Sequence, residues 1–244
     1  MRFRDRREAG IVLAKRLSAY AGRPDVLVLA LPRGGVPVAY EVASALGAPL
    51  DVFVVRKLGL PGREELAIGA IASGGVRVLN EELASQLPEA REIVDFVAAK
   101  ELRELQRREA EYRDQRPFPT IEAGTIILVD DGLATGSTMK AAVRALRQRN
   151  PARVVVAVPM GSAQACVEVK READEMICVV TPEEFYAVGE WYEDFSQTSD
   201  QEVHDLLGRA EKRHREMSEK LRTNFNSDNA ECLFFERYRD SHAL

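Results

Sequence analysis

Two adjacent acids and a run of hydroxyl residues follow a short apolar segment in the stretch IILVDDGLATGSTM, residues 126–139. The apolar segment predicts a buried strand whose carboxyl end carries Asp130 and Asp131, at the edge where ligands bind in open α/β sheets. Residues 135–138 would open a helix, so free backbone N–H groups, the helix dipole and three hydroxyls converge on one point. The stretch therefore predicts a site for a phosphorylated sugar.

Other phosphate-handling motifs do not fit this spacing. A Walker loop needs a lysine within GxxxxGK[ST], and residues 132–138 contain none. A haloacid-dehalogenase phosphatase needs Asp-x-Asp, whereas Asp130 and Asp131 are adjacent. Turn-forming Asp and helix-capping Ser or Thr would explain a few of these residues but not the whole string. The pattern favours a ligand site over a structural turn.

The composition restricts the class of protein. A chain of 244 residues with 45% hydrophobic content can bury a full core, and one large α/β domain is the default expectation. The net charge of -5 gives no global reason to expect nucleic acid or an anionic membrane as the main partner. The three cysteines are far apart without a CxxC pair, which indicates reduced thiols. Because no stretch approaches the ~20 apolar residues of a membrane span, we expect a soluble cytoplasmic protein.

The elements that must position the acid pair alternate along the chain. Buried strands are predicted at 26–30, 52–55, 125–129, 153–158 and 175–180, with helices at 36–46, 137–149 and 163–171. Such alternation is typical of parallel βαβ units. We predict an α/β fold with a single doubly wound parallel sheet flanked by helices, a small hood or substrate element and a C-terminal helix.

The remaining segments surround this sheet. An opening helix precedes the first strand, a mobile loop is expected at 56–65, and a hairpin follows with arms at 66–72 and 76–79. A long surface helix is predicted at about 89–116, where glutamates interleaved with arginines indicate a solvated face and not a nucleic-acid stripe. We expect one domain at 1–223, ending in a helix at about 200–221, and a tail at 224–244.

The string VDDGLATGSTM resembles the loop that binds phosphoribosyl pyrophosphate (PRPP) in type I phosphoribosyltransferases. The resemblance extends over about residues 26–195. In that family the paired acids hold the ribose hydroxyls, and the Thr-Gly-Ser-Thr turn holds the 5-phosphate. The resemblance therefore implies a PRPP site made of Asp130, Asp131, Gly132, Ala134, Thr135, Gly136, Ser137 and Thr138.

Two further segments resemble the pyrophosphate side of such a site. In LPRGG, residues 31–35, Gly34 and Gly35 would let backbone amides approach an anion, and Arg33 adds a charged donor. Residues 55–71 resemble the flexible catalytic loop of the family, which makes Arg56 and Lys57 candidates for the leaving pyrophosphate. Both are equally consistent with solvated surface charges. The resemblance thus implies four catalytic residues: Arg33, Arg56, Lys57 and Asp131.

The segment at 181–195, TPEEFYAVGEWYEDF, gathers aromatic and acidic residues where the family recognises its acceptor base. An aromatic face can stack on a planar heterocycle while a carboxylate or backbone group bonds its edge. The expected acceptor-binding residues are Tyr186, Val188, Trp191 and Asp194. The acidic-aromatic pair comes one residue later than in hypoxanthine and guanine enzymes, so either Tyr186 or Trp191 could stack. Packing of this segment against the final helix is the alternative.

The resemblance also implies the chemistry. It predicts Mg²⁺-dependent transfer of a 5-phosphoribosyl group from PRPP to a nitrogen acceptor, with Asp130 and Asp131 holding the metal through water. Hypoxanthine and guanine enzymes carry an aspartate where this chain has Ala134, which argues against those two bases as acceptors. If a proton must be removed, Glu64 or Glu65 could act as the base. A homodimer is implied as well. The main alternative is a non-catalytic PRPP-sensing regulator, and another phosphoribosyl or nucleoside-cleaving reaction stays open.

Overall fold

The computed structural model describes residues 2–80, 85, 89–114, 116–119 and 123–219. At its centre lies a five-stranded sheet with the order β2-β1-β6-β7-β8, in which every pair is parallel. The strands are β1 (Val26–Ala30), β2 (Leu50–Val52), β6 (Thr125–Val129), β7 (Arg153–Met160) and β8 (Glu175–Val180). The predicted parallel sheet is confirmed. Its strand order changes direction between β1 and β6, which is the switch point where such sheets bind ligands.

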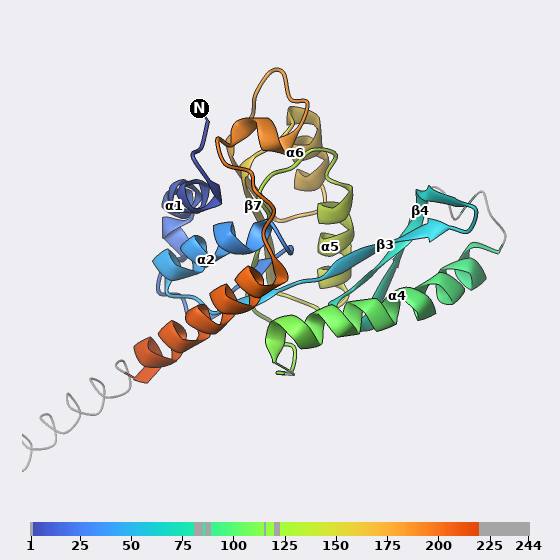
Figure 1. The fold of residues 1–244 in the computed structure, drawn as a ribbon, viewed down its shortest axis with the longest axis horizontal. Helices are drawn as coiled ribbons and strands as arrows, with labels where there is room; N and C mark the ends of the chain where they lie inside the picture. Colours follow the sequence, from blue (N-terminus) through green and yellow to red (C-terminus); the bar gives the residue numbers. More distant parts are fainter. Residues whose placement is uncertain (1, 81–84, 86–88, 115, 120–122, 220–244) are drawn as a thin grey trace, which may run out of the picture.

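Side chains of β1 alternate between two cores, because successive residues of a strand point to opposite faces. Val26, Val28 and Ala30 belong to one hydrophobic cluster, and Leu27 and Leu29 belong to the other. The first cluster is covered by α1 (Arg6–Arg16), α2 (Gly35–Leu46) and the C-terminal helix (residues 200–219), the second by α5 (Ser137–Arg147) and α6 (Ala163–Lys170). Figure 1 shows α1 and α2 on one side of the sheet and α5 on the other.

A second, antiparallel sheet extends away from this core as an arm (Figure 1). It contains β3 (Val55–Leu60), β4 (Arg63–Ala72) and β5 (Val76–Leu79), the last two joined by the short helix η2 (Ser73–Gly75), and α4 (Ala90–Arg113) packs along it. The predicted loop at 56–65 is therefore wrong. Leu58 is buried in the core and Leu60 packs against it, so the segment gains an apolar face that its many charges conceal in the sequence.

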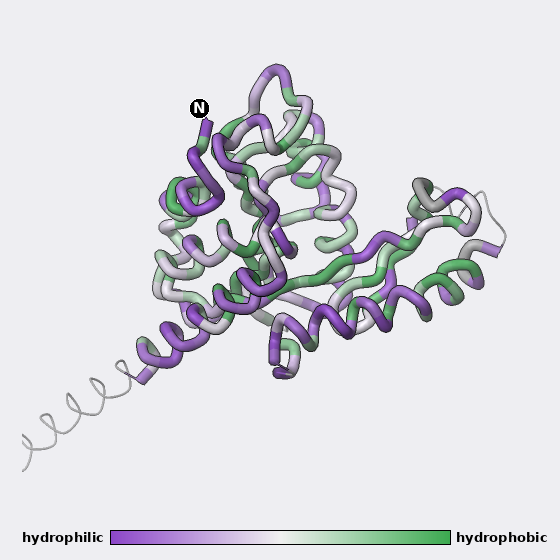
Figure 2. Tube along the Cα trace, in the orientation of Figure 1, coloured by the Kyte–Doolittle hydropathy of each residue, from purple (hydrophilic) through white to green (hydrophobic). Residues whose placement is uncertain are grey.

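Other sequence predictions are confirmed with small shifts. The strands 125–129 and 175–180 have the predicted bounds, whereas 52–55 divides into the end of β2, a two-residue connector and the start of β3. The long helix appears as α4, along which Figure 2 shows hydrophobic and hydrophilic residues alternating. The predicted end of the domain at 223 and the tail at 224–244 lie outside the described residues. Within the described ranges no helix is long and apolar enough to cross a bilayer.

The N-terminus and the hood segment, residues 181–195, lie together at one end of the sheet. Phe3 forms a parallel bridge with Tyr192, and both side chains are buried beside Met160. Within the hood a short helix, η3 (Val188–Trp191), precedes this bridge. The first residues of the chain are thereby fixed close to its last strand. A further short helix, η1 (Ser18–Tyr20), follows α1.

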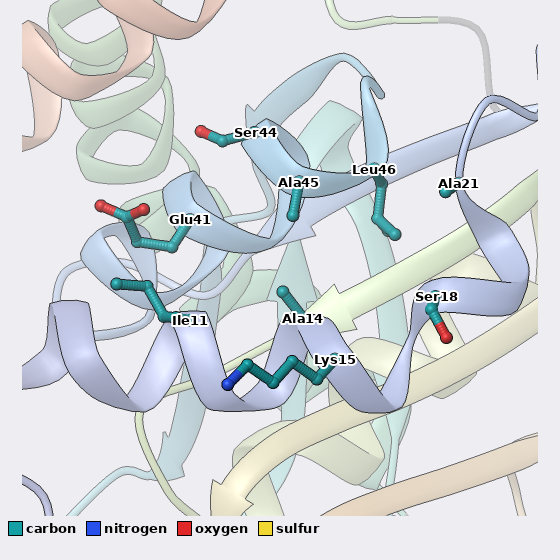
Figure 3. A pocket seen from close by; sticks show the side chains of 9 residues that line it. All are labelled: Ile11, Ala14, Lys15, Ser18, Ala21, Glu41, Ser44, Ala45 and Leu46. Atoms are coloured by element: carbon teal, nitrogen blue, oxygen red, sulfur yellow. The ribbon is translucent and has the colours of Figure 1, made fainter.

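A groove of about 510 Å³ runs between α1 and α2 (Figure 3). Its walls include Ile11, Ala14 and Leu46, so it is largely apolar. The groove follows the C-terminal half of α2, whereas the loops expected to bind phosphate meet the N-terminal end of that helix. It is therefore separate from the acid pair after β6.

Candidate functional site

The acid pair and the hydroxyl turn lie where β6 ends and α5 begins. The Asp131 N–H donates to Oδ1 of Asp130 at 2.9 Å, which ties the first carboxyl to the backbone of the second acid. Gly136 then adopts a left-handed conformation, with φ of 71°, and starts α5 without a side-chain cap. Gly136 has no side chain to cap the helix, and the Ser137 N–H makes only a long bond of 3.4 Å to Oγ1 of Thr135, so this helix start can offer backbone N–H groups to an anion. Thr135 and Ser137 are exposed, and their hydroxyl oxygens lie 3.1 Å apart.

The loop after β7 supports this turn from below. The Leu133 N–H donates to the Met160 carbonyl at 3.0 Å, and the Ser162 N–H donates back to the Leu133 carbonyl at 2.9 Å. The Ser162 hydroxyl also donates to the Ala134 carbonyl at 2.8 Å. The backbone that carries the exposed Thr135 and Ser137 hydroxyls is therefore held in place by hydrogen bonds to the loop after β7. Hydrogen-bonded support of this kind suits a site that must keep its shape before a ligand binds.

Asp131 is held by an arginine from the start of the chain. Nε of Arg6 lies 2.8 Å from Oδ2 of Asp131, and the two side chains are only 11% and 15% exposed. The Tyr192 hydroxyl donates to the Asp131 backbone carbonyl at 2.6 Å. The N-terminus and the hood thus both contact the acid that the sequence predicts to bind ribose.

Burial opposes the charges on the two acids. It raises the pKa of Asp130 well above its ordinary value, and the adjacent Asp131 raises it further. Burial also raises the pKa of Asp131, although the Arg6 guanidinium opposes this shift. Two neighbouring carboxylates beside one guanidinium form a site that a further cation would stabilise.

The LPRGG segment packs directly on the acids. A Cβ atom on Gly34 would lie 2.0 Å from Oδ2 of Asp131, and one on Gly35 would lie 3.0 Å from Cα of Asp130. Only glycine fits at this separation. The Pro32–Arg33 peptide bond between the strand and these glycines is cis. The two loops are neighbours because Ala30 and Val129, the last residues of β1 and β6, pair in register.

The three predicted cations of the pyrophosphate side lie in different places. Arg33 is half-buried and lies 3.7 Å from Asp200, at the start of the C-terminal helix. Arg56 forms an ion pair with Glu101 of α4. Lys57 is exposed on the opposite face of β3 and lines a cavity of about 390 Å³ together with Ser137. The structure thus brings Lys57 near the hydroxyl turn, residues 135–138. The catalytic roles of Arg33, Arg56 and Lys57 stay predictions.

The predicted acceptor residues come from the hood segment, but they do not converge on one point. Val188 packs on the loop that follows β6, since a Cβ atom on Gly132 would lie 2.5 Å from Cγ1 of Val188. Trp191 stacks on Phe185 with ring centroids 6.5 Å apart, whereas Tyr186 is 77% exposed. The Asp194 carboxylate accepts from the Ser196 N–H at 2.9 Å. Of the four predicted acceptor residues, Val188 is therefore the one packed on the loop that carries the acids.

Comparison with known proteins gives independent information about the family and the fold. The family model for the phosphoribosyl transferase domain matches residues 7–194. This chain belongs to the phosphoribosyltransferase family. The crystal structure of TT1426 from Thermus thermophilus is 43% identical, with a TM-score of 0.74 over 85% of this chain and 98% of that chain. The fold of this phosphoribosyltransferase chain is therefore shared with a solved structure.

Curated relatives of this phosphoribosyltransferase chain match it over different lengths. Two Mycobacterium tuberculosis proteins, each named "Putative phosphoribosyl transferase", are 48% identical over 217 residues, which is 89% of this chain and 48% of theirs. The chain thus spans about half the length of these relatives. The protein named uracil phosphoribosyltransferase from Aeropyrum pernix is 30% identical over 145 residues, 53% of this chain and 66% of that protein.

The acids of this phosphoribosyltransferase chain fit the expected metal. Mg²⁺ keeps several waters and uses one or two carboxylates together with phosphate oxygens, so it needs no cage of protein ligands. Among the described residues no group of three or more His, Cys, Asp or Glu side chains could enclose a metal ion. Asp130 and Asp131 would hold the ion through water.

Sequence reasoning missed some residues of the site and could not place others. Arg6 belongs to the arginine-rich start MRFRDRR, which gives no sign of contact with a loop far along the chain. Tyr192 lies in the aromatic cluster that the sequence does reveal, but Tyr186 and Trp191 are the better matches to the family pattern. The side chains of Glu64 and Glu65, the predicted bases, lie outside the described residues.

Proposed function

We propose that this chain transfers a 5-phosphoribosyl group from PRPP to a ring nitrogen of a nucleobase or similar acceptor. The bond between ribose C1 and the pyrophosphate oxygen breaks, the C1–N bond forms, and the acceptor loses the proton of that nitrogen. One observation carries the proposal: Gly34 and Gly35 pack against the acid pair beside an uncapped helix start. This packing supports the proposal that one ligand contacts the carboxylates with its ribose and the two loops with its phosphate groups.

The charges in the reaction match the residues around this point. Leaving pyrophosphate gathers negative charge while the sugar becomes oxocarbenium-like, so fixed cations and oriented amides lower the barrier. The backbone amides of Arg33 and Gly34 would hold the pyrophosphate together with the Arg33 side chain, since the Leu31 and Gly35 N–H groups already donate to the carbonyls of Val129 and Leu31. Thr135 and Ser137 would hold the 5-phosphate. Asp130 and Asp131 would hold Mg²⁺, which would supply positive charge to offset the negative charge of the phosphates. The relative from Aeropyrum pernix makes uracil the first acceptor to test.

The proposal is tested with PRPP, Mg²⁺ and a panel of nucleobases. We expect saturable PRPP binding by calorimetry and pyrophosphate release with at least one base. The double variant Asp131→Asn with Thr135→Ala should abolish binding while the circular dichroism spectrum stays unchanged. Binding without turnover for any acceptor would favour a regulatory protein, and unchanged affinity in the double variant would refute the site.

Gly34→Ala gives a second test that removes no charged group from the chain. Its new methyl group would meet Oδ2 of Asp131 at 2.0 Å, so the carboxylate or the loop has to move. We expect the affinity for PRPP to fall by about tenfold or more, equivalent to one charged hydrogen bond. Gly208→Ala is the control, because a Cβ at Gly208 meets nothing within 4 Å. Equal affinity in the two variants would contradict the proposed packing.

The wider assignments are tested separately. A homodimer is what the resemblance to the family implies, and sedimentation of the purified chain at micromolar concentration would show it. The relatives from Mycobacterium tuberculosis are about twice as long as the region that matches this chain. The acceptor and partners proposed for this chain therefore need not be those of the longer proteins. Assays with a full-length relative would decide whether its additional part changes the acceptor.

A further inference from the structure

Several contacts fix the Arg6 guanidinium. Nε donates to Oδ2 of Asp131 at 2.8 Å, and Nη1 donates to the Ser196 carbonyl at 2.7 Å. The Phe195 ring lies beneath the guanidinium, 4.1 Å from its central carbon. Because the planar group is held along two edges and one face, it offers Asp131 a donor with a defined direction.

The carboxylate of Asp131 is enclosed on the other side by Gly34. A Cβ at Gly34 would meet Oδ2 at 2.0 Å and Nε of Arg6 at 3.2 Å, so the glycine leaves room for just this ion pair. Arg6 and Gly34 together determine where Oδ2 lies. The second oxygen, Oδ1, then has a fixed direction in which to accept a hydrogen bond from a sugar hydroxyl.

We propose that Arg6 is a positioning residue for PRPP binding, which orients the Asp131 carboxylate toward the ribose hydroxyls and supplies positive charge beside the acid pair. This inference rests on the proposed function. Arg6 does not touch the reacting atoms. It acts through Asp131, and it links the N-terminus and the hood segment to the ribose subsite.

The charge balance around the acids supports this role. Asp130 and Asp131 are adjacent and largely enclosed, and like charges at this separation repel. Arg6 forms the ion pair with Asp131 at the acid pair, whereas the neighbouring Arg7 pairs with Glu41 on α2. An arginine on the first turn of α1 therefore offsets part of the repulsion without entering the phosphate loop.

A purely structural role makes a different prediction, and Arg2 provides the matched control. Nε and Nη2 of Arg2 both donate to the Tyr192 carbonyl, at 3.1 and 2.9 Å. Arg2 thus also fixes the N-terminus to the hood, but these bonds go to backbone and not to an acid of the site. If Arg6 acted only as such a tie, Arg6→Met and Arg2→Met would change ligand binding equally.

The experiment compares Arg6→Met, Arg6→Lys and Arg2→Met with the wild-type chain. The dissociation constants for PRPP and for inorganic pyrophosphate are measured with Mg²⁺, together with the thermal midpoint. We expect Arg6→Met to weaken PRPP binding by roughly 10- to 100-fold, the equivalent of a charged hydrogen bond, with little change for pyrophosphate. Arg6→Lys keeps the charge but not both donors, so it should recover part of the loss. Arg2→Met should bind PRPP normally.

The outcomes separate this inference from the function beneath it. If the wild-type chain binds PRPP and Arg6→Met binds it within about twofold of wild type, a change too small for a lost charged hydrogen bond, the positioning role is overturned and the function stands. Equal losses for PRPP and pyrophosphate, or an equal loss in Arg2→Met, would also overturn the role. A wild-type chain that binds no PRPP would overturn the proposed function, and this inference with it.

Discussion

Asp130→Asn should unfold at a higher temperature than the wild-type chain when no ligand or divalent metal is present, yet lose most of its affinity for PRPP. Burial and the adjacent Asp131 disfavour a charge on Asp130 in the folded state. The amide removes that charge, and its oxygen can still accept from the Asp131 N–H. For PRPP, the loss of a charged acceptor should cost about tenfold to 100-fold in affinity.

The pH dependence of this effect has a definite sign. A carboxyl whose pKa is raised by folding contributes stability that is present below its unfolded value and is lost as the pH rises through the folded value. The thermal midpoints of Asp130→Asn and wild type should therefore converge near pH ~4, the ordinary pKa of an aspartate, and separate toward neutrality. The control is Asp25→Asn, because Arg23 lowers the pKa of the exposed Asp25 to about 2 and its removal should not stabilise the chain. A lower thermal midpoint for Asp130→Asn than for wild type at neutral pH would contradict the raised pKa of Asp130.

Arg113→Met should destabilise the fold by about 3–5 kcal/mol, the typical cost of leaving a buried partner charge without its counterion. Arg113 lies at the end of α4 with its side chain 4% exposed, and it bonds Asp51 at 2.8 Å and Glu109 at 2.9 Å. It also donates to the Val52 carbonyl at 2.6 Å. One side chain thus joins the arm to the edge strand β2. Urea unfolding at neutral pH, followed by circular dichroism, measures the change.

Two further variants show whether the buried charge is the cause. Arg107→Met removes an exposed pair with Glu104 on the same helix, and it should cost no more than about 1 kcal/mol. Adding Asp51→Asn to Arg113→Met should restore part of the lost stability, because burial already raises the pKa of Asp51 and the amide carries no charge. An Arg113→Met variant no less stable than Arg107→Met would exclude this account.

Most of the central sheet could be predicted because its strands are largely apolar runs, whereas the short β2 contains Asp51 and begins two residues before the predicted strand. β6 and β8 have the expected bounds, and β1 ends at the predicted Ala30. The arm could not be predicted in the same way. The apolar face of β3 consists of Leu58 and Leu60 among charged and glycine residues, and only the packing of α4 on the sheet identifies it as a buried face. Local pattern therefore predicts the core better than a sheet whose partner helix comes later in the chain.

The candidate site likewise contains local motifs that could be predicted and tertiary contacts that could not. The acid pair, the hydroxyl turn and the paired glycines are local motifs, and the structure brings all three together. Arg6 and Tyr192 reach Asp131 through tertiary contacts, for which the single sequence has no spacing to read. The hood segment is intermediate: its aromatic content is evident from composition, but its backbone decides that Trp191 stacks on Phe185 while Tyr186 faces solvent.

The position of the arm also bears on how the chain folds. Val26 of β1 pairs with Thr125 of β6, and the whole arm lies between them in sequence. Closing so long a loop carries an entropic cost before any ladder contact compensates, whereas the pairings within the arm join near neighbours. We therefore expect the antiparallel sheet and its helix to gain hydrogen-exchange protection early in refolding. The candidate site, which needs β1 and β6 side by side, would be completed late.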